Sequence, residues 1–243
     1  MVDTAPMTTP ENTTLSQLAL GVRLRDEATF DNFLGARNRL AVEQVQALLA
    51  SPACPVVYVC GATGTGKSHV LQAACHASEA NGVHALCLSM TELVDHAPDM
   101  LDGLERFPLV CMDDLDCIQN RPAWQEAVFH IYNRLFDSGC RLLLSATLTP
   151  TELALPLRDL DSRLRASAVV QLLPPRDEDR LAILVARAER LGLVMNDEVA
   201  HYILRRASRH TGDLLGILDR LDDISLRAQR KLTVPFVKGV MGW

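Results

Sequence analysis

One short stretch of the chain carries residue types suited to holding phosphate: Gly61, Ala62, Thr63, Gly64, Thr65, Gly66, Lys67 and Ser68. These residues fit the pattern G-x-x-x-x-G-K-[ST] at every fixed position. Glycines let the backbone turn several N–H groups toward a phosphate chain, and the positive end of a following helix adds to that field. In this pattern the lysine reaches the β- and γ-phosphates, and the serine hydroxyl ligates Mg²⁺. The stretch, called the phosphate loop below, therefore predicts nucleotide binding, with a plain glycine-rich turn as the alternative.

The flanking sequence supplies the elements that such a loop needs. Residues 55–60 (PVVYVC) form a short β-branched apolar run, which is typical of a buried strand. Residues 69–80 (HVLQAACHASEA) place apolar side chains at helical spacing. The order of strand, loop and helix is the one that the motif requires.

A second candidate site lies where residues 109–114 (LVCMDD) end in two carboxylates. A buried parallel strand should not finish in paired acids unless a cation sits at its carboxyl end, where α/β sheets place their ligands. Asp113 is then the natural partner of Mg²⁺, directly or through water, and Asp114 is placed to polarise the attacking water. The alternative is a strand that ends in a helix-capping acid.

The remaining pattern indicates how these segments are positioned. Further strands are expected at residues 83–90, 141–147 and 169–173, alternating with helices such as residues 122–137. This order predicts an α/β fold: a parallel sheet of five strands between two helical layers. From residue 176 onward the apolar period is that of helices, at residues 177–191, 196–208 and 213–230, so residues 176–243 should form a small helical domain.

Composition narrows the function classes. The chain has 243 residues, of which 48% are apolar, enough for one large α/β unit and a small appended one. A net charge of −6 argues against general coating of nucleic acid. Seven cysteines, among them Cys60, Cys87 and Cys111, lack paired metal-type spacing and are expected to be buried thiols in a reducing cytoplasm. No signal peptide or membrane-spanning run is visible, so neither export nor a membrane partner is expected.

The N-terminal region gives a weaker signal. Residues 1–14 are rich in Thr and Pro and are expected to be disordered. Residues 15–22 (LSQLALGV) alternate apolar side chains, which suits a first strand or a peptide that docks while extended in an apolar groove of a partner. Periodicity alone does not separate the two.

Over residues 15–243 the chain resembles the AAA+ family of the bacterial replication initiator DnaA, and within it most closely the Hda group. The resemblance is carried by the phosphate loop, by LVCMDD as a Walker B strand, by TFDNFLGARNRLA (29–41), by DLDSRLRA (159–166, box VII) and by AQRKLTVPFVK (228–238). It implies an AAA+ nucleotide-binding domain over residues 25–175, a lid domain over residues 176–243, and ADP or ATP with Mg²⁺ as cofactors.

The resemblance also implies roles for single residues. Gly35 and Asn38 fall in the segment that holds the adenine base, and Arg163 matches the arginine finger, which acts on nucleotide held by a neighbouring subunit. Gln17, Leu18 and Leu20 match the motif, here within residues 15–24, by which Hda binds the β sliding clamp of DNA polymerase III, although Gly21-Val22 replace the usual Pro-Leu.

One family position departs from its pattern. Gly212 stands where DnaA proteins have the lid arginine called sensor II. Arg209, about one helical turn earlier, is either a substitute or an exposed charge on a lid helix.

The function that the resemblance implies is negative regulation of replication initiation. The chain would bind adenine nucleotide, dock on the DNA-loaded clamp and stimulate hydrolysis of DnaA-bound ATP, with weak ATPase activity of its own. DNA would be contacted mainly through the clamp, and self-association is left open. Because the chain ends at Trp243 without a helix-turn-helix domain, a complete initiator is not expected. The alternative is a remodelling or helicase-loading ATPase that acts in its own right.

Overall fold

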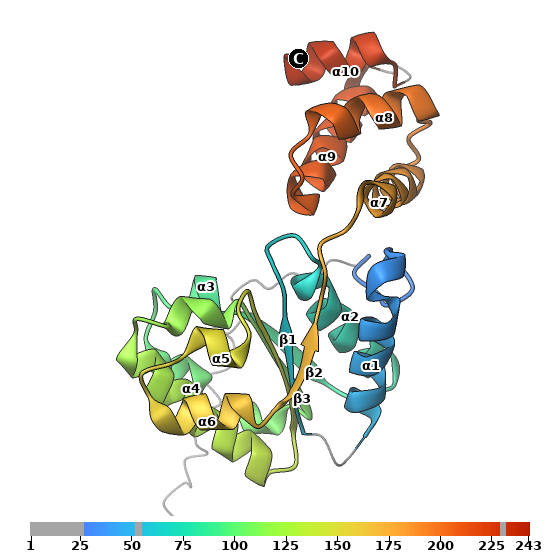
Figure 1. Ribbon diagram of the computed structural model, residues 1–243. Helices are drawn as coiled ribbons and strands as arrows, with labels where there is room; N and C mark the ends of the chain where they lie inside the picture. The colour runs from blue at the N-terminus through green and yellow to red at the C-terminus, as the bar shows by residue number, and fades with distance from the viewer. Residues whose placement is uncertain (1–26, 52–54, 229–231) are drawn as a thin grey trace, which may run out of the picture.

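In a computed structural model, which describes residues 27–51, 55–228 and 232–243, five parallel strands form one sheet (Figure 1). The strand order is β2-β3-β4-β1-β5, so every strand is joined to the next through a crossover. Because parallel strands end at the same edge of a sheet, the segments after them gather on that edge. The strands are β1 (Val56–Cys60), β2 (Ala85–Ser89), β3 (Leu109–Asp113), β4 (Arg141–Ala146) and β5 (Ala168–Gln171).

Helices cover both faces of the sheet, because successive side chains of a buried strand point to opposite sides. Val57 and Val59 of β1 pack into the core under helices α1 (Arg39–Ala50) and α2 (Lys67–Ala80). Val56, Tyr58 and Cys60 of the same strand pack into the core on the other face. That face is covered by α3 (Met90–Leu93), α4 (Pro122–Asp137), α5 (Pro150–Leu153) and α6 (Arg158–Arg165), with short 3₁₀ turns η2 (Pro98–Leu101), η3 (Leu104–Arg106) and η4 (Leu115–Ile118) between them.

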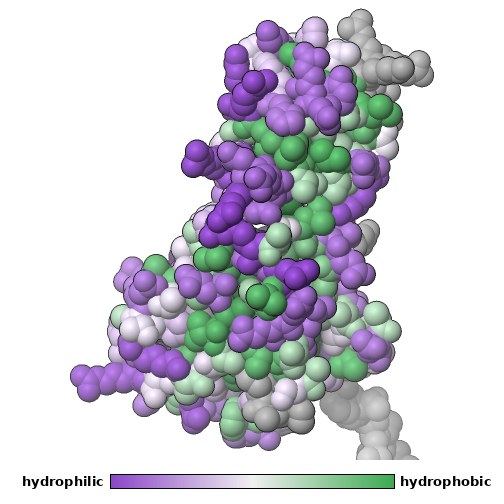
Figure 2. All heavy atoms as spheres, turned by 45° about the vertical axis from the view of Figure 1, so that its right-hand side comes forward, coloured by the Kyte–Doolittle hydropathy of each residue, from purple (hydrophilic) through white to green (hydrophobic). Residues whose placement is uncertain are grey.

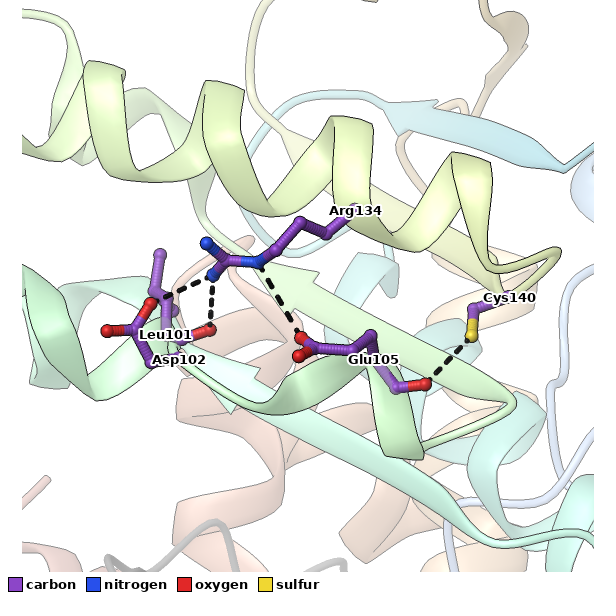
Figure 3. A network of polar contacts seen from close by, with 5 residues as sticks. All are labelled: Leu101, Asp102, Glu105, Arg134 and Cys140. Atoms are coloured by element: carbon purple, nitrogen blue, oxygen red, sulfur yellow. Dashed lines mark hydrogen bonds and ion pairs between the residues drawn. The ribbon is translucent and has the colours of Figure 1, made fainter.

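A polar network fixes the long helix α4 to the turns that precede β3 (Figure 3). Arg134 donates a 2.9 Å hydrogen bond to Asp102 and lies 3.6 Å from a carboxylate oxygen of Glu105. The Cys140 thiol donates to the backbone carbonyl of Glu105. The network holds the edge of the sheet opposite to the strands' carboxyl ends, so its role is structural.

The C-terminal part is a separate helical lid above the strands' carboxyl ends (Figure 1). It consists of α7 (Asp177–Arg190), α8 (Asp197–Arg206), α9 (Thr211–Ala228) and α10 (Val234–Met241). These helices share a core of their own, in which Leu184, Ile203 and Leu218 are fully buried. The lid is small, and Figure 2 shows an apolar band that crosses its surface between polar patches.

The structure confirms the five-stranded parallel sheet and the helical lid predicted from periodicity. Helix α10 was not predicted as a separate element. The short helices between β2 and β3 carry too few turns to show a periodic pattern. The expected disorder of residues 1–14 and the segment at residues 15–24 lie outside the described residues.

Most of the described cysteines are buried, as expected. Six lie in the part that the structure describes and all are free thiols, with Cys60, Cys87 and Cys111 buried. Burial raises the pKa of Cys117 to about 11, so even this less buried thiol stays protonated at neutral pH.

Within the part of the chain that the structure describes, no helix is both long and apolar enough to cross a lipid bilayer.

Candidate nucleotide-binding site

The phosphate loop joins the end of β1 to the start of α2, at the edge of the sheet that faces the lid. Lys67 is the first residue of α2, and its side chain is buried. Its ammonium group donates a 2.9 Å hydrogen bond to the carbonyl of Gly61 and a longer one to that of Ala62. The lysine is thus held inside the loop that it would share with a phosphate chain.

Two glycines of the loop have no room for a side chain. At Gly66, φ is 99°, and a Cβ atom would lie 2.6 Å from the Phe33 ring. At Gly61 a Cβ atom would lie 2.5 Å from the carbonyl oxygen of Leu172. These contacts press the loop against the segments on either side of it, which explains why glycine is required at both positions.

The two acids at the end of β3 are tied to the neighbouring strand. Asp113 accepts hydrogen bonds from the Ser145 hydroxyl of β4 and from the backbone N–H of Asp114. The same Asp114 N–H lies 3.1 Å from the Ser145 oxygen. Ser145 therefore fixes the Asp113 carboxylate and the backbone of Asp114 at the end of the strand.

Asp114 has unusual surroundings. Its φ of 58° lies in the left-handed region, which turns the chain sharply after β3. Burial, followed by the charge of Asp113, raises the pKa of its carboxyl group, while Lys67 acts in the opposite direction. A carboxylate that is costly to ionise near a second acid suits a site that receives positive charge.

These groups line one cavity of about 700 Å³ between the sheet edge and the lid. Of the predicted site residues, the lining includes Gly35, Asn38, Thr63, Gly64, Thr65, Gly66, Lys67, Ser68, Asp113 and Asp114. Gly61 and Ala62 lie at the base of the loop and reach the site through their bonds to Lys67. The volume falls within the range typical of ligand pockets.

Residues 27–38, which precede α1 and are called the entry segment below, close one side of the cavity. Asn38, in the turn η1 (Ala36–Asn38), is buried. Its side-chain amide donates a 2.8 Å hydrogen bond to the carbonyl of Leu173 and accepts one of 2.8 Å from the N–H of Leu173. Gly35 faces Asp179 of α7, whose carboxylate also accepts from the N–H of Ala36. In this arrangement Asn38 holds the wall of the cavity in place, and direct contact with a base stays a prediction.

The lid closes the other side. Thr211 at the start of α9 donates a 2.9 Å hydrogen bond to the carbonyl of Gly64, and His210 and Gly212 also line the cavity. Arg187 of α7 pairs with Glu27 of the entry segment and, at 2.9 Å, with Asp219 of α9. Arg209 lies elsewhere: it lines a separate cavity of about 440 Å³ between α7 and α8.

Arg163 is not part of this cavity. It lies exposed on α6, with its guanidinium 6.0 Å from the centre of the Tyr132 ring. The neighbouring Arg165 is ion-paired with Asp161, whereas no carboxylate pairs with Arg163 among the described residues. Gln17, Leu18 and Leu20 fall outside the described part of the chain.

Several site residues were missed from the sequence alone. Ser145 carried a usable signal, because it lies one residue before the end of β4, the strand that pairs with the acid-bearing β3. His69, directly after the motif, approaches the carbonyl of Thr29 at 2.8 Å and packs edge-on against Phe33. Nothing in local periodicity indicated that the entry segment would fold back onto the phosphate loop.

The donor set fits Mg²⁺ bound together with phosphate. Ser68 and Asp113 offer the hard oxygen atoms that this cation prefers, and both line the cavity beside Lys67. Among the described residues no group of three or more His, Cys, Asp or Glu could hold a metal by itself. Protein sites for Mg²⁺ commonly use one or two carboxylates together with waters and phosphate oxygens.

Comparison with known families gives two matches that divide the chain. Residues 24–171 match the model described as the bacterial DnaA ATPase domain. Residues 177–241 match the model described as the Hda lid domain.

Solved structures show the same fold. Domain III of the Thermotoga maritima replication initiation protein DnaA is 20% identical, with a TM-score of 0.78 over 90% of this chain and 97% of that one. AMPPCP-bound DnaA from Aquifex aeolicus is 24% identical, with a TM-score of 0.68 over 84% and 67% of the two chains. The Thermotoga maritima RuvB Holliday junction branch migration motor is 18% identical, with a TM-score of 0.67 over 90% and 72%.

Proposed function

The chain belongs to the DnaA-related AAA+ family and is most like Hda, and on this basis we propose that it is a regulator that inactivates DnaA. It binds adenine nucleotide in the cavity under the lid, docks on the DNA-loaded sliding clamp, and stimulates hydrolysis of ATP held by DnaA. Loss of that ATP converts the initiator to its inactive ADP form.

The cavity supports the nucleotide part of the proposal. Lys67 and the N–H groups at the start of α2 would face a phosphate chain in this cavity, and Ser68 and Asp113 would hold the Mg²⁺ that neutralises its charge. DnaA from Aquifex aeolicus, which shares this fold, binds the ATP analogue AMPPCP. The nucleotide here serves to assemble the protein, and its own turnover is slow.

One observation carries the regulatory part: Arg163 is exposed, lacks a carboxylate partner in the described chain, and lies outside the cavity. An arginine so placed has no nucleotide of its own to act on. Presented to a neighbouring subunit, its guanidinium stabilises the negative charge that develops on the γ-phosphate, an effect of about 10³ to 10⁵ in rate for such residues.

The test compares Arg163→Ala with Arg165→Ala in hydrolysis of DnaA-bound ATP on clamp-loaded DNA. We expect Arg163→Ala to lose at least about a hundredfold in stimulation, because it removes charge stabilisation specific to the transition state. Arg165→Ala is the matched control, since it removes an exposed arginine of the same helix that is already paired with Asp161. Equal stimulation by Arg163→Ala and the wild type would remove the mechanism.

Clamp docking is assigned to Gln17, Leu18 and Leu20 and has its own test. Removal of residues 1–22 should abolish clamp-dependent stimulation and leave nucleotide affinity unchanged, because the part of the chain that the structure describes, from residue 27 onward, already encloses the cavity. Clamp binding by size-exclusion chromatography and nucleotide binding by calorimetry measure the two effects. Clamp binding that survives the truncation would assign docking to another part of the chain.

A second candidate is an ATPase that acts in its own right, and the cavity favours it in one respect. Lys67, Asp113 and Asp114 all face the same space, so the groups that hydrolysis requires are together. Multiple-turnover hydrolysis by the purified chain, accelerated by single-stranded DNA and indifferent to the clamp, would establish this alternative.

A further inference from the structure

The first turn of the lid helix α9 lies directly on the phosphate loop. Besides the hydrogen bond from Thr211 to Gly64, the loop meets the imidazole ring of His210. A Cβ atom placed at Gly64 would lie 3.1 Å from Cδ2 and 3.5 Å from Nε2 of that ring. The Cδ2–Nε2 edge of His210 therefore faces the loop.

The opposite edge of the ring faces the start of α9. A Cβ atom at Gly212 would lie 2.9 Å from Cε1 and 3.1 Å from Nδ1 of His210. The ring thus occupies the space that a side chain at position 212 would take. On the same edge, a carboxylate oxygen of Asp213 lies 3.6 Å from Nδ1, and Asp213 is itself held by the Ser208 hydroxyl at 2.6 Å.

Three lid side chains that can carry positive charge line the cavity: Arg187, Arg190 and His210. Arg187 is committed to Glu27 and Asp219. Asp219 is eight residues beyond Thr211, or about 12 Å along α9 at 1.5 Å per residue, and Arg190 is the last residue of α7. Of the three, His210 is the one whose ring a Cβ atom at Gly64 of the phosphate loop would meet.

We propose that His210 is a phosphate-binding residue, which donates a hydrogen bond from Nε2 to the phosphate chain of the nucleotide in the cavity. An imidazolium ring carries a proton on each nitrogen, so it can face the carboxylate of Asp213 with one and a phosphate oxygen with the other. The contact also draws α9 onto the loop, so that the lid responds to the phosphates. This inference rests on the proposed nucleotide binding and assigns it a lid residue.

Calorimetric titration with MgADP and MgATP tests the assignment. His210→Ala should weaken binding of at least one of the two nucleotides about tenfold, equivalent to about 1.4 kcal/mol. Arg209→Ala is the matched control, because it removes the adjacent basic side chain, which lines the other cavity. Affinities within twofold of the wild type for both nucleotides in His210→Ala would overturn the proposal.

Two further measurements separate contact from folding. Gly212→Ala keeps the imidazole but places a methyl group where the ring lies, so it should weaken binding as well while the thermal unfolding midpoint is preserved. In the wild type, the ring ¹⁵N resonances of His210 should shift on addition of MgATP and stay unchanged with adenosine. If the wild type binds MgATP but the ring ¹⁵N resonances of His210 do not shift, the contact between His210 and phosphate is refuted and the proposed nucleotide binding stands. A wild type that binds no nucleotide would refute the proposed function with it.

Discussion

Single residues in this protein are placed to compensate one another's charge around the phosphate loop. Lys67 is buried and hydrogen-bonded to the loop's own carbonyls, and it opposes the rise that burial and Asp113 cause in the pKa of Asp114. Ser145 holds Asp113 and the Asp114 N–H together at the end of β3. The site is therefore preorganised for a ligand that brings both phosphate and a cation.

A prediction at this scale concerns Asp114→Asn in the protein without nucleotide or metal. Because the folded-state pKa of Asp114 lies above its ordinary value of 3.8, its ionised form opposes folding. The resulting loss in the free energy of unfolding is absent below the ordinary pKa of Asp114 and complete above its raised pKa in the folded protein. Asn also tolerates the left-handed backbone at this position.

Asp114→Asn should therefore be more stable than the wild type at neutral pH, by at most about 1 kcal/mol for a partly exposed group, and equal to it near pH 3. Chemical denaturation in EDTA at both pH values measures the difference. A variant that is less stable at pH 7 would contradict this account of the Asp114 environment.

At the scale of elements, the site depends on how the entry segment and the connection from β5 to α7 are joined. The five strands and the lid helices α7, α8 and α9 were predictable, because long apolar periods and strand-end acids are local signals. The joining contacts were not. Asn38 pairs with Leu173, which is 135 residues away, and no local pattern encodes such a partner. The contact of His210 with Gly64 likewise joins residues far apart in the sequence.

Asn38→Ala tests this junction. The change removes two hydrogen bonds to the Leu173 backbone and should cost about 1 to 2 kcal/mol in the free energy of unfolding. Asn81→Ala is the control, because Asn81 is exposed and its side-chain amide donates a hydrogen bond to the carbonyl of Ala77 at the end of the same helix. Urea denaturation compares the two variants. Equal losses would mean that Asn38 does not hold the junction, which would leave its amide available for the base.

At the scale of the whole molecule, the cavity and Arg163 lie on different parts of the protein. The cavity lies between the sheet edge and the lid, whereas Arg163 lies on α6 among the helices that cover one face of the sheet. Under the proposed function, the chain binds one nucleotide for itself and offers Arg163 to the nucleotide held by DnaA. Whether Arg163 acts on ATP held by DnaA or on ATP held by a second copy of this chain decides between the proposed regulator and an ATPase that acts in its own right.

The most direct test follows two ATP pools in a single turnover. DnaA is loaded with γ-³²P-ATP, this protein with γ-³³P-ATP, and phosphate release is followed on clamp-loaded DNA. The account predicts fast release of ³²P, slow release of ³³P, and loss of the fast phase with Arg163→Ala. Fast release of ³³P, or release of ³²P that is unchanged by Arg163→Ala, would contradict it.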